Sequence, residues 1–348
     1  MTRMKPEIEI DGAFGEGGGQ IIRTALSLSL VTSKSFRIFN LRARRQKPGL
    51  RPQHLAAVKA AQKISGSEAI GAEIGSGDLS FFPKPARPGD FRIDIHTAGS
   101  TGLVFQTLLP VLANLDRASR LLITGGTHNP KSPCFNFISD CFLKIISLMG
   151  IEVEPEISRY GFYPKGRGEV SFKIHPWKNR DVVFKATEPA FWQGPEVEIL
   201  LAGLEMHIAE RERDEAAERL GVDPGSMKIN FLPSDMGPGN AMLIKYSGAH
   251  GRSEIFTGYG EPGKRAERVA SEVCREAKYF VKSGAQLDPY LADQLLIYLA
   301  MSAGGEFTTN QPSSHFHTNL KIIREFIKMG DELSHPAPDL SLVKIFPA

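Results

Sequence analysis

The chain repeats one order of predicted elements three times, and this repetition is the strongest constraint on its fold. In the first copy, Ile8 and Ile10 alternate with acidic residues as in a half-buried strand, and apolar residues then recur at helical spacing. The segment 19–26 matches the segment 102–109 position by position in character, which puts Gln106 where the first copy has Arg23. Each copy is predicted as strand, helix, strand, helix and two strands. The pairs of strands are expected to close on Phe81-Phe82-Pro83, Phe162-Tyr163-Pro164 and Ile345-Phe346-Pro347.

A repeat of roughly 80 to 90 residues is longer than the period of a solenoid, so we expect three compact α+β units packed together. The third unit is interrupted between its first strand, expected at residues 182–185, and its first helix, expected at 293–302. Residues 188–283 have turn-rich borders and are predicted to form a small inserted α/β domain. The large domain then comprises residues 1–187 and 284–348. The inserted domain is predicted to contain strands at 197–201, 227–232 and 241–246 and helices at 209–220 and 265–282.

Composition excludes some classes of protein. No run approaches the roughly 20 apolar residues of a membrane span, and the N-terminus has no apolar signal segment, so we expect a cytoplasmic protein with no membrane partner. Three cysteines without a Cys-x-x-Cys pair indicate buried thiols rather than a disulfide framework or a zinc site. A net charge of +3 is too small to indicate a nucleic-acid partner, so the local clustering of charge has to decide.

The first predicted turn is rich in glycine, with four glycines in the five residues 15–19. Glycines leave backbone N–H groups accessible, and the following helix N-terminus adds partial positive charge, which suits a phosphate. The turn is neither a Walker loop nor a clean dinucleotide fingerprint, so a tight turn without a ligand is the alternative. Glu16 and Arg23 favour the functional interpretation because they add a carboxylate and a guanidinium.

A basic segment follows the second predicted strand. Its five cations lie within ten residues and repel one another unless an anion sits between them, although a solvated loop is the alternative. Gln53 and His54 follow directly and open a helix, so cations, polar groups and a helix N-terminus converge. We therefore expect this segment to bind phosphate. The five cations are Arg42, Arg44, Arg45, Lys47 and Arg51.

In the third copy, residues 290–294 are expected just before a helix, and residues 311–319 are expected as a polar loop. His315 lies in that loop, which the repeat makes equivalent to the basic segment and to residues 127–133. All three units are therefore expected to direct polar loops to one place. On an extended segment, His315 and His317 would point to one side, so a divalent-metal pair is an alternative, although no carboxylate or cysteine lies nearby in sequence.

Six segments together resemble the RNA 3′-terminal phosphate cyclase family, and the resemblance runs nearly end to end. They are residues 11–23, 42–54, 97–110, the Gly-Pro-Gly-Asn sequence 237–240, 290–294 and 312–319. The resemblance implies an ATP-dependent enzyme that converts an RNA 3′-phosphate into a 2′,3′-cyclic phosphodiester. It also implies that His315 forms a covalent histidyl-AMP and that AMP then passes to the RNA end as RNA-(3′)pp(5′)A. An imidazole that is neutral near pH 7 suits such a transfer.

The resemblance also implies a role for each matched residue. Glu16 is expected to hold Mg²⁺ or Mn²⁺. The phosphate and RNA end are expected to contact Gln20, Arg23, Arg42, Arg45, Gln53 and His54. The adenosine pocket is expected to comprise Gln106, Pro133, Tyr290, Leu291, Ala292, Asp293 and Gln294. The sequence departs from the family pattern at Gln311, where some relatives have histidine, and at His317, where others have an apolar residue.

Two other functions fit parts of the pattern. Cyclase-like binding proteins of ribosome assembly lack the nucleophile, whereas this chain keeps His315, Glu16 and the arginines. Carboxyvinyl transferases have similar repeated units, but they need basic residues spread over two separate halves. In the insert, Phe256 and the cluster Lys264, Arg265 and Arg268 either contact RNA or nucleotide or belong to a solvated helix face.

Overall fold

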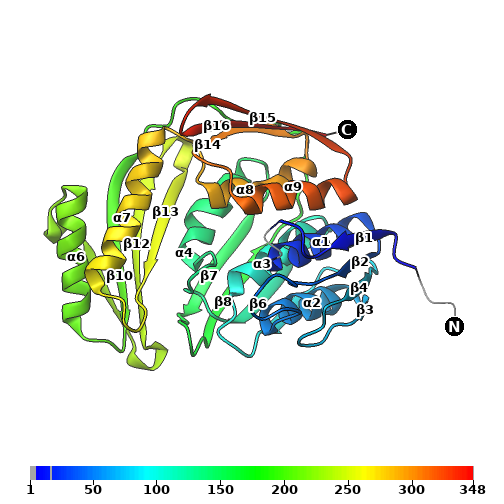
Figure 1. Ribbon diagram of the computed structural model, residues 1–348, viewed down its shortest axis with the longest axis horizontal. Helices are drawn as coiled ribbons and strands as arrows, with labels where there is room; N and C mark the ends of the chain where they lie inside the picture. Colours follow the sequence, from blue (N-terminus) through cyan, green and yellow to red (C-terminus); the bar gives the residue numbers. More distant parts are fainter. Residues whose placement is uncertain (1–4, 16–17, 348) are drawn as a thin grey trace.

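The computed structural model describes residues 5–15 and 18–347 and has an α+β architecture with four four-stranded sheets (Figure 1). Three of the sheets share one topology: the first two strands in sequence are parallel, and the second pairs antiparallel with the fourth, which pairs antiparallel with the third. The first sheet contains β1 (Ile8–Asp11), β2 (Phe36–Phe39), β3 (Glu68–Ile70) and β4 (Leu79–Phe82). The second contains β5 (Asp90–Asp94), β6 (Ser119–Gly125), β7 (Val153–Arg159) and β8 (Gly168–Ile174). The third contains β9 (Phe184–Ala186), β14 (Gly305–Thr309), β15 (Met329–Ala337) and β16 (Leu340–Pro347).

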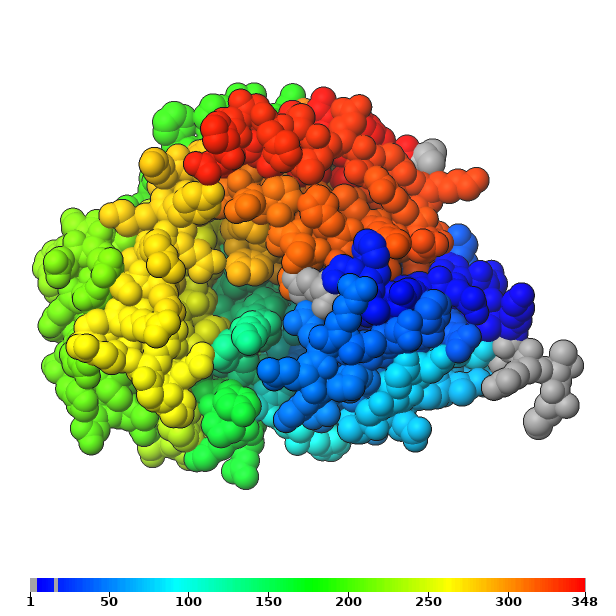
Figure 2. Space-filling view, in the orientation of Figure 1, coloured from blue at the N-terminus to red at the C-terminus, as the bar shows by residue number. Residues whose placement is uncertain are grey.

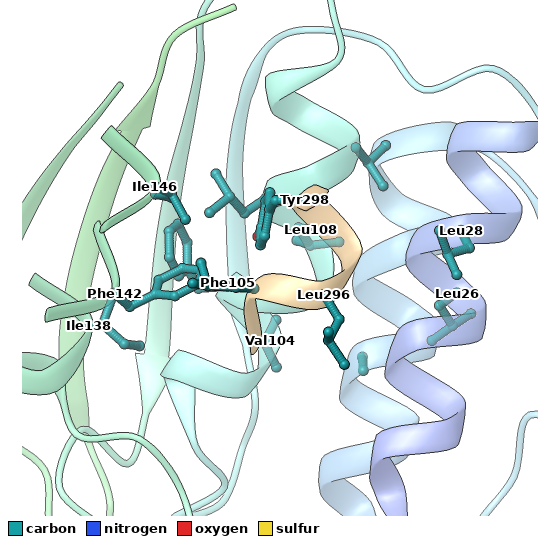
Figure 3. Close-up of a cluster of buried hydrophobic side chains, with 14 of the residues drawn as sticks. Leu26, Leu28, Val104, Phe105, Leu108, Ile138, Phe142, Ile146, Leu296 and Tyr298 are labelled. Carbon is teal, nitrogen blue, oxygen red and sulfur yellow. The ribbon is translucent and has the colours of Figure 1, made fainter. Parts of the chain in front are cut away.

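Helices connect these strands and pack in one hydrophobic core. Figure 1 shows α8 and α9 between the third sheet and α1, and Figure 3 shows side chains of α1, α3 and α8 meeting in the interior. The ring of Phe105 on α3 stacks on that of Phe172 on β8 with centroids 3.8 Å apart, which fixes the helix on its sheet. The helices are α1 (Gly19–Thr32), α2 (Pro52–Ser65), α3 (Thr101–Ala113), α4 (Phe135–Phe137), α5 (Leu143–Ser147), α8 (Pro289–Ala300) and α9 (Ser314–Phe326), with a π-helical turn at Ile138–Phe142 between α4 and α5.

The fourth sheet lies within the segment between β9 and α8 and has its own hydrophobic cluster. Its strand order is β11-β10-β12-β13, and α6 and α7 pack beside it. The strand β13 was not expected from the sequence. The elements are β10 (Gln193–Ala202), α6 (Met206–Leu220), β11 (Lys228–Leu232), β12 (Gly239–Ser247), β13 (Ser253–Tyr259) and α7 (Ala266–Ser283), with short 3₁₀ turns at Pro224–Ser226, Ser234–Met236 and Ala249–Gly251.

Two helices begin earlier than the sequence indicated. The side chain of Asp288 accepts the N–H of Leu291 and caps α8, and Ser313 accepts the N–H of Phe316 and caps α9. Helical geometry turns about 100° per residue, so side chains two positions apart point to different sides. The expectation that His315 and His317 lie on an extended segment and face one side is therefore wrong.

The second aromatic-proline sequence does not end a strand. Phe162-Tyr163-Pro164 lies in the connection between β7 and β8, where the carbonyl of Phe162 accepts the N–H of Gly166 at 2.6 Å. This turn reverses the chain before β8 begins, so the expected common ending of the three units is wrong for the second unit. The three cysteines are buried, as expected. Within the described ranges no helix combines the length and apolar character that crossing a bilayer requires.

The Gly-Pro-Gly-Asn sequence joins the fourth sheet to the second. Phe162 is buried, and a Cβ on Gly239 would overlap its ring. Gly239 is therefore needed because the backbone of β12 approaches the Phe162 ring too closely for any side chain.

We expect Gly239→Ala to lower the free energy of unfolding by roughly 1–3 kcal/mol, because the added methyl group overpacks this contact. Chemical denaturation measures the change. Gly77→Ala is the matched control, since a Cβ there meets no atom within 4 Å. Equal stability losses in the two variants would contradict the proposed role of the Phe162 contact.

Candidate functional site

One cavity of about 760 Å³ is lined by residues of helices and connections that follow strands of all four sheets, and by β13 of the fourth sheet. Figure 2 shows the surface hollowed between the yellow β13–α7 region and the blue and orange segments that contain α1 and α8. The connections after β2 and β6 contribute to its wall, and α9, which follows β14, contributes His315 and Asn319. The polar segments that the sequence placed at one site therefore do meet there.

Most of the site residues expected from the sequence line this cavity. They are Gln20, Arg23, Arg42, Arg45, Gln53, His54, Gln106, Pro133, Tyr290, Asp293, Gln294 and His315. The side chains of Leu291 and Ala292 are instead fully buried in α8 and do not line it. Glu16, the expected metal ligand, lies outside the described residues.

Hydrogen bonds between side chains fix the part of the cavity wall that α1 and α9 form. Arg23 donates to Oε1 of Gln20 at 2.7 Å, and Nε2 of Gln20 donates to Oδ1 of Asn319 at 3.0 Å. Desolvation lowers the pKa of Arg23 to about 10, and the negative charge of Asp293 opposes that shift. The guanidinium thus stays charged and is held with little freedom, as binding an oxyanion requires.

The basic segment supplies the next part of the wall. Arg42 has a left-handed backbone with φ of 54° and donates to the carbonyl oxygens of Lys47 at 2.6 Å and Gly49 at 3.1 Å. Desolvation, followed by the charges of Arg45 and Arg51, lowers its pKa. This crowding of cations is unfavourable by itself, so an anionic ligand would stabilise the segment.

His54 is a neutral group among these cations. Its Nδ1 accepts the backbone N–H of Arg51 at 3.1 Å, so the ring proton is on Nε2. Desolvation first, and then the charges of Arg23, Arg42 and Arg51, lower its pKa to about 3. At neutral pH His54 therefore offers the cavity an N–H donor rather than an extra charge.

The third unit contributes α8 and α9. His315 is in the first turn of α9, lines the cavity and has its Nδ1 buried, whereas His317 is exposed. The hydroxyl of Ser313 donates to Asp293 at 3.3 Å, which ties the cap of α9 to α8. Gln106 on α3 donates to Oε1 of Gln294 at 2.5 Å, so the amides expected in one pocket do meet.

Residues of β13, of α7 and of the segment between them form the opposite wall, which sequence reasoning largely missed because it did not identify β13. Phe256 and Lys264 line the cavity, and Lys264 pairs with Glu272 at 2.8 Å. Arg265 and Arg268 are exposed and belong to the solvated face of α7. The wall also includes Thr257, Glu261, Glu272 and Glu276, and burial raises the pKa of Glu276.

The described residues contain no cluster of metal-ligating side chains. In residues 5–15 and 18–347, no group of three or more histidine, cysteine, aspartate or glutamate side chains is arranged to hold a metal ion. The alternative of a metal held by His315 and His317 also loses its geometric basis, because the helix separates the two rings.

We expect the stability contributed by neutral His54 to fall as the pH drops below about 6.5, since the unfolded histidine is protonated there and the folded one is not until about pH 3. The loss amounts to at most about 1.4 kcal/mol per pH unit. Urea unfolding of the wild type and of His54→Gln between about pH 7 and pH 5 measures it. The stability advantage of the wild type over the variant should shrink on acidification, and a constant difference would contradict the assignment.

Comparison with known proteins gives one consistent result. The family model described as RNA 3′-terminal phosphate cyclase matches residues 14–332. A protein of that name from Ectopseudomonas mendocina is 44% identical over 325 residues, which is 93% of this chain and 94% of the relative. Another from Koribacter versatilis is 43% identical over 327 residues, which is 94% of this chain and 92% of the relative. The chain therefore belongs to the RNA 3′-terminal phosphate cyclase family.

Proposed function

We propose that this protein uses ATP to convert an RNA 3′-terminal phosphate into a 2′,3′-cyclic phosphodiester, with AMP carried covalently on His315. The observation that carries the proposal is that His315 shares one cavity with the cations Arg23, Arg42 and Arg45. A nucleophile beside a cluster that favours anions suits nucleotidyl transfer to a phosphate. The names of the matched relatives point to the same reaction.

In the first step, a ring nitrogen of His315 attacks the α-phosphorus of ATP. We infer that the attacking atom is Nε2, because Nδ1 is buried. A phosphorus–nitrogen bond forms, the bond to the bridging oxygen breaks, and pyrophosphate leaves. The phosphoramidate is labile, so AMP can be passed on.

In the second step, an oxygen of the RNA 3′-phosphate attacks the phosphorus of the bound AMP. The phosphorus–nitrogen bond breaks, His315 is regenerated, and RNA-(3′)pp(5′)A forms. In the third step, the neighbouring 2′-hydroxyl attacks the RNA phosphorus, loses its proton to solvent and displaces AMP. Activation by AMP supplies the leaving group that a terminal phosphate lacks.

The two ends of the cavity suit the two substrates. We assign the RNA phosphate to Arg23, Arg42, Arg45, Gln20, Gln53 and His54, where guanidinium forks can grip phosphate oxygens. We assign adenosine to the side formed by Gln106, Pro133, Asp293, Gln294 and Tyr290. Tyr290 is 52% exposed at the start of α8, and we assign its ring to stacking on adenine. Mg²⁺ or Mn²⁺, if held by Glu16, would offset phosphate charge.

We also propose that the three sheets of common topology are copies of one unit that together form the large domain, residues 1–187 and 284–348. Their identical strand order and directions support this. Residues 188–283 would then be an inserted domain, and their separate hydrophobic cluster supports that division. The insert would serve the reaction by closing one wall of the cavity.

The first test uses ATP labelled at the α-phosphate. We expect acid-labile, base-stable label on the denatured wild-type chain and none on His315→Ala, because the nucleophile is lost. His317→Ala is the matched control and should keep the label, since that ring is exposed two residues away. A wild-type chain that never takes up label would instead favour a non-catalytic cyclase-like binding protein.

The second test separates the two nucleotidyl transfers. Arg42→Ala should slow transfer of AMP to a 3′-phosphorylated RNA by roughly 10- to 100-fold, the effect of losing a charge-assisted contact, and should slow self-adenylylation much less. Arg44→Ala is the matched control because Arg44 is exposed and does not line the cavity. Quench-flow measurement of each step decides, and equal losses in both steps would refute this division of roles.

A further inference from the structure

The cavity accommodates the RNA end, but the rest of the strand has to leave it over some part of the surface. The wall formed by the insert carries three glutamates, Glu261, Glu272 and Glu276, and the cations beside them, Lys264 and Arg268, are each already paired with Glu272 at 2.8 Å. Like charges repel the phosphates of an RNA strand, so this wall disfavours its passage. The loops of the second sheet are therefore the more favourable path for the RNA strand to leave the cavity.

Those loops present basic residues in an unusual backbone conformation. Lys131 and Arg167 have φ values of 62° and 61°, as Arg42 in the cavity has 54°. The left-handed region is unfavourable for residues with a Cβ, so surrounding contacts must hold these cations in place. Lys131 lines the cavity, and Arg167 is exposed on the connection between β7 and β8.

The loops touch one another and lead away from the cavity. A Cβ built on Gly99 would lie 3.6 Å from Cβ of Gln53, which lines the cavity. A Cβ on Gly166 would lie 2.7 Å from Cα of Ala98, the residue before Gly99. Asn129, near Lys131 in sequence, donates to the carbonyl of Ala98. A series of contacts thus connects the cavity wall to the β7–β8 connection.

The β7–β8 connection combines an exposed aromatic ring with cations. The ring of Tyr163 is 71% exposed, although its neighbour Phe162 is buried against His128 and Gly239. Lys165 and Arg167 are exposed, and among the residues that the structure describes neither forms a salt bridge within 4.0 Å. A nearby acid, Asp235, is neutralised by Arg159 at 2.5 Å.

We propose that the RNA strand preceding the 3′-terminal phosphate crosses an exit rim formed by Lys131, Tyr163, Lys165 and Arg167. A base stacks on Tyr163, and the three cations contact backbone phosphates, the combination by which proteins hold single strands without reading their sequence. The inference rests on the proposed function, because it takes the RNA 3′ end to occupy the cavity. Phe162 and the turn at Gly166 hold Tyr163 as a fixed platform.

Equilibrium binding tests the rim without requiring catalysis. The probes are a fluorescent, 3′-phosphorylated single-stranded RNA of about ten nucleotides and a nucleoside 3′-monophosphate as competitor. Tyr163→Ala should weaken binding of the RNA by roughly 5- to 100-fold and leave the monophosphate unaffected, whereas Tyr163→Phe should bind as the wild type does. Tyr279→Ala, at a 41% exposed tyrosine on α7, is the matched control and should bind RNA normally.

The salt dependence of RNA binding tests the contribution of the cations separately. Lys165→Gln and Arg167→Gln should each lower the slope of log affinity against log salt by about 0.7, the value for one phosphate contact on a single strand. Unchanged RNA affinity and salt slope in these variants, or an equal loss with the monophosphate, would overturn the exit rim. Labelling by ATP alone is measured on the same samples. Absence of label in the wild type refutes the covalent mechanism, whereas label with unchanged RNA binding in Tyr163→Ala refutes only the rim.

Discussion

The buried amide of Asn319 is the interaction on which the arrangement of the site depends. Its Oδ1 accepts from Thr24 at 2.7 Å and from Gln20 at 3.0 Å, and its Nδ2 donates to the carbonyl of Asp293 at 3.1 Å. One side chain on α9 that makes three hydrogen bonds therefore fixes α1 and α8, which belong to different sheets. Because a buried polar group that loses a partner is costly, the three helices are held in one relative position. The three helices that Asn319 connects, α1, α8 and α9, carry Arg23, Asp293 and His315 respectively.

Because these helices are held in one relative position, cations lie close together in the cavity although their charges repel one another. Desolvation lowers the pKa of Arg23 and of Arg42, which shows that the free site holds charge at a cost. Desolvation, followed by the charges of the neighbouring arginines, lowers the pKa of His54 and keeps it neutral, so the cluster does not gain a further charge. If this cluster binds phosphate, as we propose, the cations are already in place and binding needs little reorganisation.

The sequence alone predicted those features of the site that depend on the order of residues within short segments. The glycine turn, the basic segment and the polar loops could be placed at one site because the repeat made them equivalent, and most of the residues named from the sequence do line the cavity. Helix starts were predicted wrongly where a capping side chain determines the first residue of the helix. Ser313 caps α9, so His315 and His317 lie in this helix, which residue spacing alone did not reveal. The wall from β13 was missed for another reason. Contacts between segments far apart in the sequence, such as Gly239 against Phe162, depend on packing that no local pattern records.

The common topology explains why three unlike loops reach one cavity. In each of the three sheets the second strand runs parallel to the first, and the connection to the next helix leaves from the same end of that strand. The segments after these strands supply different chemistry to the cavity: Arg42 and Arg45 come from the first connection, Pro133 from the second, and His315 from the first turn of α9 in the third. Equivalent backbone positions thus supply unlike groups to one space. A repeated architecture can therefore build an asymmetric site without any change of fold, because only the side chains at the shared position have to differ.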